Sequence, residues 1–491
     1  MQRGAGILLP IFELPSKYGV GSLGKWAYAF VDFLKKSAQK YWQILPLAQT
    51  GYGDSPYQSV CDYSGNPYFI DLETLRAKRL LTYREVEGAI EKGSTVDYGK
   101  LFVTRYSLLW KAFNRFDTSD RNFRAFVKKG DFKDYALFMS LSNRFKKPWC
   151  DWPAEFRDRN EDALNKYYFE NKTEMLYWQF LQYEFRLQYD ALKKYANKNG
   201  VKIIGDLPLY VAYDSVDVWA NSKEFLLGEN YKPKKIAGVP PDYFSEEGQM
   251  WGNPVYDYEY QKSNGFAFWK RRMEIAKSKF DIVRVDHFRG LAAFWAIDDG
   301  KATAKYGEWM TAPGDEILSA IGADGILAED LGLVDEDVKT LLDKYDLPGM
   351  KVLSFALDGD EENPYLPWNI TENSVTYTGT HDNDTLVGYF KSLTKEQFEE
   401  HKKIIRECLD YLKIYKSVTG IQSTCDAMID IAFAVKSDIT IVPMHDHLLL
   451  DGSYRINNPG HVGYWVARIK ESVFTDTLAQ AIKRRTKRFD R

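Results

Sequence analysis

The chain of 491 residues has few of the side chains that build metal centres or disulfide frameworks, namely four cysteines and six histidines. Cys61, Cys150, Cys408 and Cys425 are too widely spaced for a zinc motif or a small disulfide-rich domain. The histidines lack a metal-binding pattern such as H-E-x-x-H. We therefore expect a protein of a reducing compartment that uses no metal and no cofactor.

Long apolar runs and long blocks of one charge are also missing. No stretch approaches the ~20 apolar residues of a membrane span, and Pro10 and Glu13 interrupt the apolar start of the chain. Lysine and arginine total 66 against 69 aspartates and glutamates, which gives a formal charge of −3. With a mean hydropathy of −0.43, these features predict a cytoplasmic protein that binds neither membranes nor nucleic acid.

Aromatic residues, in contrast, make up 15% of the chain, including 33 tyrosines and 13 tryptophans. Aromatic rings cover the flat C–H faces of sugars, and nearby polar groups bind the sugar hydroxyls. A large core filled with aromatic side chains gives the same composition. Composition is therefore compatible with a carbohydrate site but does not distinguish it from core packing.

Short apolar segments rich in β-branched residues alternate with helical stretches. This alternation favours a parallel sheet or barrel over a sandwich. Eight such segments predict an α/β fold, a (β/α)8 TIM barrel. The predicted strands are residues 6–12, 41–47, 201–207, 280–285, 325–328, 350–357, 374–378 and 438–443. We expect one catalytic barrel over residues 1–491, with mainly helical insertions at 72–199 and 394–435 around its C-terminal rim.

Acidic residues follow several predicted strands, among them Asp286, Glu329 and Asp382. The C-terminal ends of barrel strands converge, so carboxylates that are distant in sequence meet there. Arg284 precedes Asp286 by two residues on the same strand face and can keep its carboxylate ionised. A purely structural ion pair would give the same pattern.

Glu329 is a candidate general acid, provided that burial raises the pKa of its carboxyl group. Its neighbour Asp330 points the other way on the strand, and we interpret it as structural. Asp382 is placed to hold sugar hydroxyls, with His381 beside it. Such polar turns also form for local backbone reasons.

These segments resemble the amylomaltases, or 4-alpha-glucanotransferases, of the α-amylase clan. The resemblance spans nearly the whole chain. The matching segments are residues 4–10, 18–19, 50–58, 65–68, 205–208, 251–254 and 454–460, together with the three acidic strand ends. The resemblance implies a nucleophile at Asp286 preceded by Arg284, an acid/base at Glu329, and a transition-state-stabilising Asp382 beside His381.

The resemblance also implies a glucan-binding loop at residues 50–58. In this loop Ser55 and Tyr57 would line the donor side, and Tyr52 would form a further glucan-contact surface. At the strand end of the 205–208 segment, Asp206 is a further candidate substrate-binding residue.

Residues 238–252 are predicted to form a mobile loop. The resemblance implies that Trp251 and Asn253 belong to the loop that curls over the bound chain. The segment that begins at His445 departs from the family pattern. We therefore assign no role to His445 or His447.

The reaction implied is a retaining transfer of α-1,4-glucan segments between maltooligosaccharides or starch chains through a covalent glucosyl-enzyme. An α-amylase-type hydrolase with the same three carboxylates is the alternative, and a catalytically silent glucan-binding scaffold is a more distant one. We expect maltooligosaccharides and α-1,4-glucans as ligands, and a monomer or weak homo-oligomer.

Overall fold

The structure is a computed structural model that describes residues 1–51, 53–91, 93–241, 246–332 and 335–491. At its centre, an eight-stranded sheet has the order β11-β8-β5-β2-β1-β14-β13-β12. Its paired strands are parallel. The outer strands also meet, because the amide of Ala328 donates to the carbonyl of Pro348 at 3.0 Å. The (β/α)8 barrel predicted from the sequence is confirmed.

All eight predicted strands belong to this sheet. They are β1 (Gly4–Leu8), β2 (Tyr41–Gln43), β5 (Lys202–Leu207), β8 (Ile282–Val285), β11 (Ile326–Ala328), β12 (Gly349–Val352), β13 (Ser374–Tyr377) and β14 (Ile439–Pro443). Their residues are almost entirely buried, as expected when helices cover one face of a barrel sheet and side chains fill the other. Several strands end earlier than predicted, because apolar residues continue beyond the hydrogen-bonded ladder into loops and 3-10 turns.

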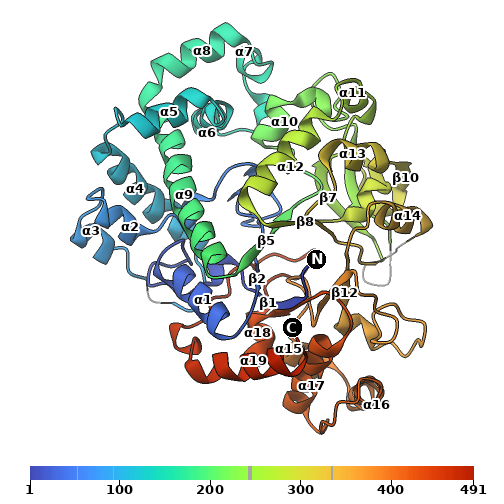
Figure 1. Ribbon diagram of the computed structural model, residues 1–491. Helices are drawn as coiled ribbons and strands as arrows, with labels where there is room; N and C mark the ends of the chain where they lie inside the picture. Colours follow the sequence, from blue (N-terminus) through green and yellow to red (C-terminus); the bar gives the residue numbers. More distant parts are fainter. Residues whose placement is uncertain (52, 92, 242–245, 333–334) are drawn as a thin grey trace.

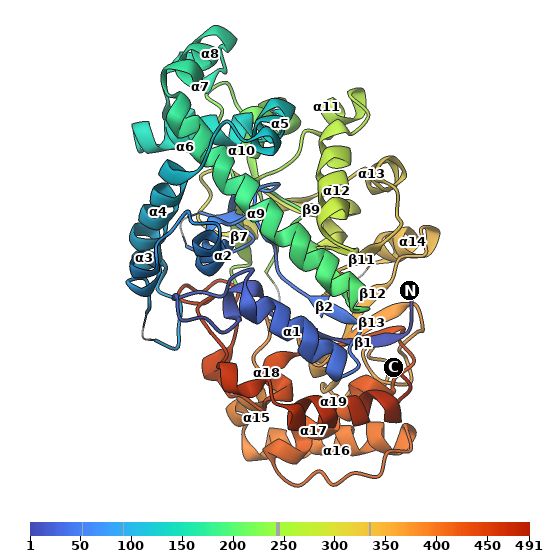
Figure 2. The same ribbon diagram turned by 60° about the vertical axis from the view of Figure 1, so that its left-hand side comes forward.

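Helices surround the barrel (Figure 1). After α1 (Lys25–Lys36) and the short hairpin of β3 (Gln49–Thr50) and β4 (Ser59–Cys61), a run of helices precedes β5. These are α2 (Leu72–Ala77), α3 (Tyr83–Glu87), α4 (Tyr98–Arg115), α5 (Arg121–Lys129), α6 (Lys133–Phe145), α7 (Ala154–Arg157), α8 (Glu161–Glu170) and α9 (Lys172–Lys198). Figure 2 shows α9 extending from this group towards the barrel, and its buried residues contact both.

The remaining helices follow β5 along the chain. They are α10 (Val216–Ala220), α11 (Tyr258–Ser263), α12 (Ala267–Lys279), α13 (Gly314–Ile321), α14 (Glu336–Lys344), α15 (Leu386–Ser392), α16 (Lys395–Tyr411), α17 (Ile421–Ala434), α18 (Met444–His447) and α19 (Asp476–Arg488). Helices α15 to α17 form a second hydrophobic cluster beside the barrel. Within the described ranges, no helix combines the length and apolar character of a membrane span.

A second sheet replaces the mobile loop predicted at residues 238–252. Strands β6 (Lys235–Val239) and β7 (Gln249–Pro254) pair antiparallel, and β9 (Ala293–Asp298) and β10 (Gly307–Thr311) extend them to the order β10-β9-β6-β7. The prediction of a loop was wrong at both ends of the segment, and residues 242–245 lie outside the described residues. The glycines and prolines of this segment indicated a loop. The pairing of β6 with β9 could not be predicted, because no pattern in the local sequence indicates a partner strand so far along the chain.

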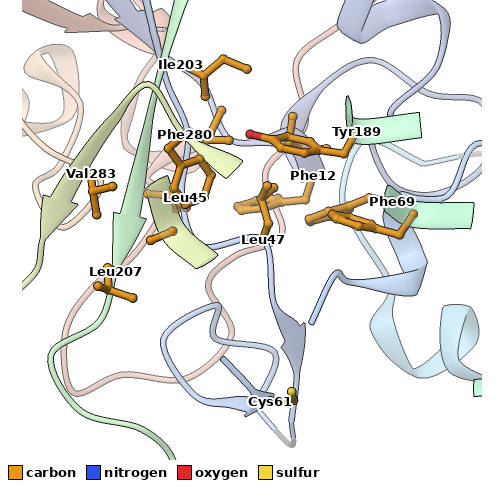
Figure 3. Packing of buried hydrophobic residues seen from close by; sticks show 14 of the residues in the cluster. Phe12, Leu45, Leu47, Cys61, Phe69, Tyr189, Ile203, Leu207, Phe280 and Val283 are labelled. Carbon is orange, nitrogen blue, oxygen red and sulfur yellow. The ribbon is translucent and has the colours of Figure 1, made fainter. Parts of the chain in front are cut away.

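Close packing fixes the strand ends that lead into the rim. Figure 3 shows the buried cluster in which Phe280, before β8, packs near Ile203 and Leu207 of β5. A methyl group on Gly205 would overlap the ring of Phe280. Glycine at this position therefore lets β5 approach β8 and places the next residue, Asp206, opposite Arg284.

Candidate active site

An ion-pair chain joins β5 and β8 at the C-terminal rim. Arg284 is 3% exposed, and its Nη1 donates to both carboxylate oxygens of Asp206 and to Oδ1 of Asp286, each at 2.8 Å. Burial opposes the charge of Arg284, but the two carboxylates raise the pKa of its guanidinium well above the usual value. Burial raises the pKa of Asp206. Asp286 keeps 28% of its side chain exposed. Among the three ion-paired residues, it is therefore the one that a ligand can reach.

Glu329 lies beside Asp286 because Ala328 of β11 pairs with Val285 of β8. Its Oε2 accepts a 2.7 Å hydrogen bond from the amide of His287, and its Oε1 accepts one of 3.2 Å from the amide of Leu331. Burial raises the pKa of Glu329 to about 8, and the charge of Asp286 adds to the rise against the opposing effect of Arg284. Glu329 is therefore protonated at neutral pH.

Tyr57 connects this pair of strands to the turn after β13. Its hydroxyl donates to Oδ2 of Asp206 at 2.7 Å, and its ring stacks on His381 with centroids 5.2 Å apart. His381 is buried, and its Nε2 lies 3.3 Å from Oδ2 of Asp382. Through Tyr57 and His381, the structure brings Asp382 to the same rim as Asp286.

Two residues of the C-terminal segment also hold Asp382, and the sequence analysis gave neither a role. Asn457 donates from Nδ2 to Oδ1 of Asp382 at 2.6 Å and from its amide to the carbonyl of His381 at 3.0 Å. Arg455 donates from Nη2 to the carbonyl of Asp382 at 2.8 Å. The polar run at 454–460 marked this segment, but only the fold reveals its partner.

The loop at residues 50–58 is tied to β7. Ser55 accepts the amide of Tyr57 on its Oγ at 3.3 Å. Gln58, which the sequence analysis did not single out, donates from Nε2 to Oδ1 of Asn253 at 3.0 Å and to the carbonyl of Trp251 at 3.3 Å. These contacts couple the predicted glucan-binding loop to the strand that carries Trp251. Tyr52 lies outside the described residues.

Trp251 lies against His287, the residue that directly follows Asp286 and whose amide binds Glu329. Its ring stands edge-on to His287, with centroids 4.8 Å apart and planes at 89°. Asn253 is buried at 4% exposure, and its Nδ2 donates to the carbonyl of Val211 at 2.8 Å. Trp251 therefore borders the site, whereas the amide of Asn253 makes its hydrogen bonds within the protein.

His445 and His447 lie at the end of β14. Nε2 of His445 is 3.1 Å from Oε2 of the fully buried Glu13. Burial lowers the pKa of His447 to about 3, which leaves its imidazole neutral. In the part of the chain that the structure describes, no three histidine, cysteine, aspartate or glutamate side chains are grouped to hold a metal ion.

Residues 19–24 read G-x-G-x-x-G, the spacing of dinucleotide-binding turns. Here the glycines permit close packing. A methyl group on Gly21 would overlap the carbonyl of Ile11, and one on Gly24 would overlap the carboxylate of Asp71. The same carboxylate accepts the hydroxyl of Ser22 at 3.0 Å. Packing within the protein therefore accounts for the pattern.

Comparison with known proteins places this site in a family. A family model for 4-alpha-glucanotransferases matches residues 9–474. The chain belongs to the 4-alpha-glucanotransferase family. The 4-alpha-glucanotransferase of Clostridium butyricum is 42% identical and covers 98% of this chain and 99% of its own length. That of Thermus thermophilus is 40% identical over 96% of this chain and 95% of its own length.

Solved structures agree with this assignment. The amylomaltase of Streptococcus agalactiae, determined in complex with acarbose, superposes with a TM-score of 0.93 at 35% identity and covers 100% of both chains. The amylomaltase of Corynebacterium glutamicum shares the fold, with a TM-score of 0.74 at 16% identity over 98% of this chain and 73% of its own. The family resemblance and the 4-alpha-glucanotransferase activity predicted from the sequence are confirmed, in preference to the hydrolase alternative.

Proposed function

We propose that Asp286, Glu329 and Asp382 carry out a retaining transfer of α-1,4-glucan segments between maltooligosaccharides or starch chains. One observation carries the proposal: Asp286 is ion-paired to Arg284 at 2.8 Å, while burial raises the pKa of the neighbouring Glu329 to about 8. A fixed carboxylate beside a protonated carboxyl group is the combination that retaining glycosidases use.

In the first step, the carboxylate of Asp286 attacks the anomeric carbon, and Glu329 donates its proton to the departing 4-oxygen. The C–O bond to the leaving chain breaks as the bond to Asp286 forms, which gives a covalent glucosyl-enzyme of inverted configuration. Equivalent positions on neighbouring strands are about 4.8 Å apart, close to the roughly 5–5.5 Å between the carboxyl groups of retaining enzymes.

In the second step, Glu329 acts as a base. Its carboxylate takes the proton of an acceptor 4-hydroxyl, whose oxygen then attacks the anomeric carbon and releases Asp286. The second inversion restores the α configuration, and Glu329 is protonated again for the next cycle.

Asp382 and His381 are assigned to the sugar unit at the point of cleavage. Each oxygen of Asp382 has one contact within the protein, to Asn457 at 2.6 Å and to His381 at 3.3 Å. A carboxylate offers about four lone-pair sites, so both oxygens can also accept sugar hydroxyls. Because its orientation is fixed before the substrate arrives, Asp382 can favour the charge distribution of the transition state.

Transfer to a sugar requires that an acceptor hydroxyl outcompete water. A well-positioned acceptor gains a large effective concentration, and a covered site excludes solvent. The contacts of Gln58 with Asn253 and with the carbonyl of Trp251 couple the 50–58 loop to β7 beside the carboxylates. We assign Ser55, Tyr57 and Trp251 to the walls of the bound glucan on this basis.

The test is product analysis after incubation with pure maltotriose. The wild type is expected to form longer oligomers together with shorter sugars, and Asp286→Asn is expected to form neither. The matched control is Asp324→Asn, since Asp324 is exposed on the loop before β11. Short products alone would contradict transfer, and an active Asp286→Asn would contradict the assignment of the nucleophile.

A cytoplasmic location, a monomer or weak homo-oligomer, and independence from cofactors stay predictions from the sequence. Light scattering at several protein concentrations measures the mass. Retention of activity after dialysis against a chelator tests the last of these expectations.

A further inference from the structure

A row of apolar residues crosses the four-stranded sheet. Trp309 of β10 pairs with Trp295 of β9, Trp295 pairs with Gly238 of β6, and Gly238 pairs with Met250 of β7. Directly paired residues of an antiparallel sheet share a face, so these four residues form a single row, here named the Trp309–Met250 row. With strands about 4.8 Å apart, the row is roughly 14 Å long.

The two ends of the row are open to solvent. Trp309 is 43% exposed and Met250 is 41% exposed. Between them Gly238 is buried, because the carbonyl of Gln249 and the side chain of Ile297 fill the space that a side chain at this position would take. An exposed apolar row of this kind is a candidate binding surface.

Trp309 is held in place although it is exposed. The guanidinium of Arg289 lies 3.8 Å from the centre of its ring. Arg289 is itself fixed by Asp335, at 2.8 Å, and by the carbonyl of Ala293, at 3.2 Å. Trp295 meets the ring at an angle of 68°, with centroids 5.3 Å apart. A ring fixed in this way loses little further entropy when a ligand stacks on it.

Contacts on both sides connect the row to the catalytic rim. Arg289 follows Asp286 by three residues, in the short helix Phe288–Leu291. At the other end, Met250 precedes Trp251, whose ring packs against His287. Figure 1 shows β10 near α14, whose N-terminal cap Asp335 binds Arg289. A chain that leaves the carboxylates on this side would pass onto the row.

The chemistry of the row fits an uncharged, ring-shaped ligand. None of its four residues is charged, and the charge of Arg289 is balanced by Asp335. Tryptophan faces stack on the C–H faces of sugars, whereas an anionic or strongly cationic partner would find no counter-charge in the row. Thr311 is exposed two residues from Trp309 on the same strand face, where its hydroxyl can bond a sugar.

We propose that the Trp309–Met250 row is an extended subsite that binds α-1,4-glucan residues beyond those at the point of cleavage, so that long chains are preferred over short ones. This inference rests on the proposed function, because it takes the same glucan as the ligand. It goes beyond that function by assigning chain-length preference to Trp309, Trp295 and Met250.

The experiment compares long amylose with maltotriose, a substrate of three sugar units. In Trp309→Ala, the ratio of kcat/KM on amylose to kcat/KM on maltotriose is expected to fall by about 3- to 10-fold, the range expected for loss of one aromatic contact. Met250→Ala leaves Arg289 and Trp309 untouched and is expected to lower the ratio in the same direction. If Trp309→Ala fails to fold, Met250→Ala alone tests the proposed subsite. Tyr415→Ala, at a 96% exposed aromatic residue, is the control and is expected to keep the wild-type ratio.

A second readout measures binding without catalysis. Migration in native gels that contain amylose is expected to be less retarded for Trp309→Ala than for the wild type and Tyr415→Ala. An unchanged ratio and unchanged retardation in Trp309→Ala and Met250→Ala would overturn the subsite. So would a wild-type dimer that Trp309→Ala dissociates while the ratio stays constant, since the row would then join two copies. Failure of the wild type to extend maltotriose would instead refute the proposed function itself.

Discussion

The amide of His287 donates a 2.7 Å hydrogen bond to Oε2 of Glu329. His287 directly follows Asp286, so the turn that carries one carboxylate also orients the carboxyl group on the neighbouring strand. The backbone of His287 has a φ of +48°, a left-handed conformation that is uncommon for a residue with a side chain. Burial lowers the pKa of its imidazole to about 4, so the ring adds no charge between the two acids at neutral pH.

The raised pKa of Glu329 predicts an alkaline limit to activity. Since burial raises this pKa to about 8, kcat/KM for maltotriose is expected to fall as the pH rises above about 8 and the acid loses its proton. Glu329→Gln should lower kcat by about 10²- to 10⁴-fold, the usual contribution of a general acid–base residue. A pH–rate profile from pH 5 to 10 measures both effects, and an alkaline limb that persists in Glu329→Gln would assign the limb to another group.

The same shift predicts how stability depends on pH. The folded-state pKa of Glu329 is about 8 against a usual 4.5, so the folded state binds this proton more tightly than the unfolded state. The resulting stability is fully present below about pH 4.5 and is lost as the pH rises through about 8. Glu329→Gln cannot ionise and should gain stability relative to the wild type between pH 5 and pH 9.

Urea denaturation at these two pH values measures the difference. Glu362→Gln, at an exposed glutamate, is the control, and its stability should track that of the wild type. Equal free energies of unfolding for Glu329→Gln and the wild type at both pH values would mean that Glu329 ionises normally in the folded protein.

Asn457 is predicted to position Asp382. Its side chain donates to Oδ1 of Asp382 at 2.6 Å, and hydrogen bonds to charged groups contribute about 1.5–3 kcal/mol. Asn457→Ala is therefore expected to lower kcat by about 10- to 100-fold, with a smaller change in KM. In the control Asn458→Ala, the amide that is lost bonds the hydroxyl of Tyr464 at 3.3 Å, and kcat should change less than about twofold. A rise in KM at constant kcat in Asn457→Ala would indicate a role in ground-state binding instead.

Trp251 is predicted to favour transfer over hydrolysis. Its ring shields the turn at His287, at a centroid distance of 4.8 Å, beside the position where an acceptor must replace water. In Trp251→Ala, water gains access, so the fraction of turnovers that end in hydrolysis should rise several-fold. Counting new reducing ends against newly formed oligomers measures this ratio. If the ratio equals that of the wild type, β7 does not control access of water.

The barrel was predictable because its strands are short apolar runs, buried on both faces and separated by helices. Strands β6 and β7 were not, since β6 pairs with β9, which comes much later in the chain, and the glycines of this segment are typical of a loop. The three acidic residues were visible because each follows a predicted strand. Asn457 was not, because a local pattern does not reveal a contact between residues 75 positions apart.

Hydrogen bonds donated by main-chain amides could not be predicted from the sequence. The amides of His287 and Leu331 hold Glu329, yet any residue type supplies an amide. The interpretation of Asp330 as a structural residue agrees with its contacts, as it accepts the amide of Met350 at 2.6 Å across the closure of the barrel.

Closure of the barrel gives the last prediction. Asp330 of the β11 end bonds the amide of Met350 in β12 and lies 3.6 Å from Nζ of Lys351. A methyl group on Gly349 would overlap the carboxylate of Asp330. Gly349→Ala should therefore destabilise the fold by about 1–3 kcal/mol, as overpacking of a core does.

Because Asp330 is adjacent to Glu329, the same substitution should also lower activity. In the control Gly99→Ala, the nearest atom lies at an ordinary 3.5 Å, and alanine within α4 should leave stability unchanged or raise it by up to about 1 kcal/mol. Urea denaturation of both variants separates the two cases. Equal stability of Gly349→Ala and the wild type would mean that β12 can move away from β11, and that the contact of Asp330 with Met350 is not what closes the barrel beneath Glu329.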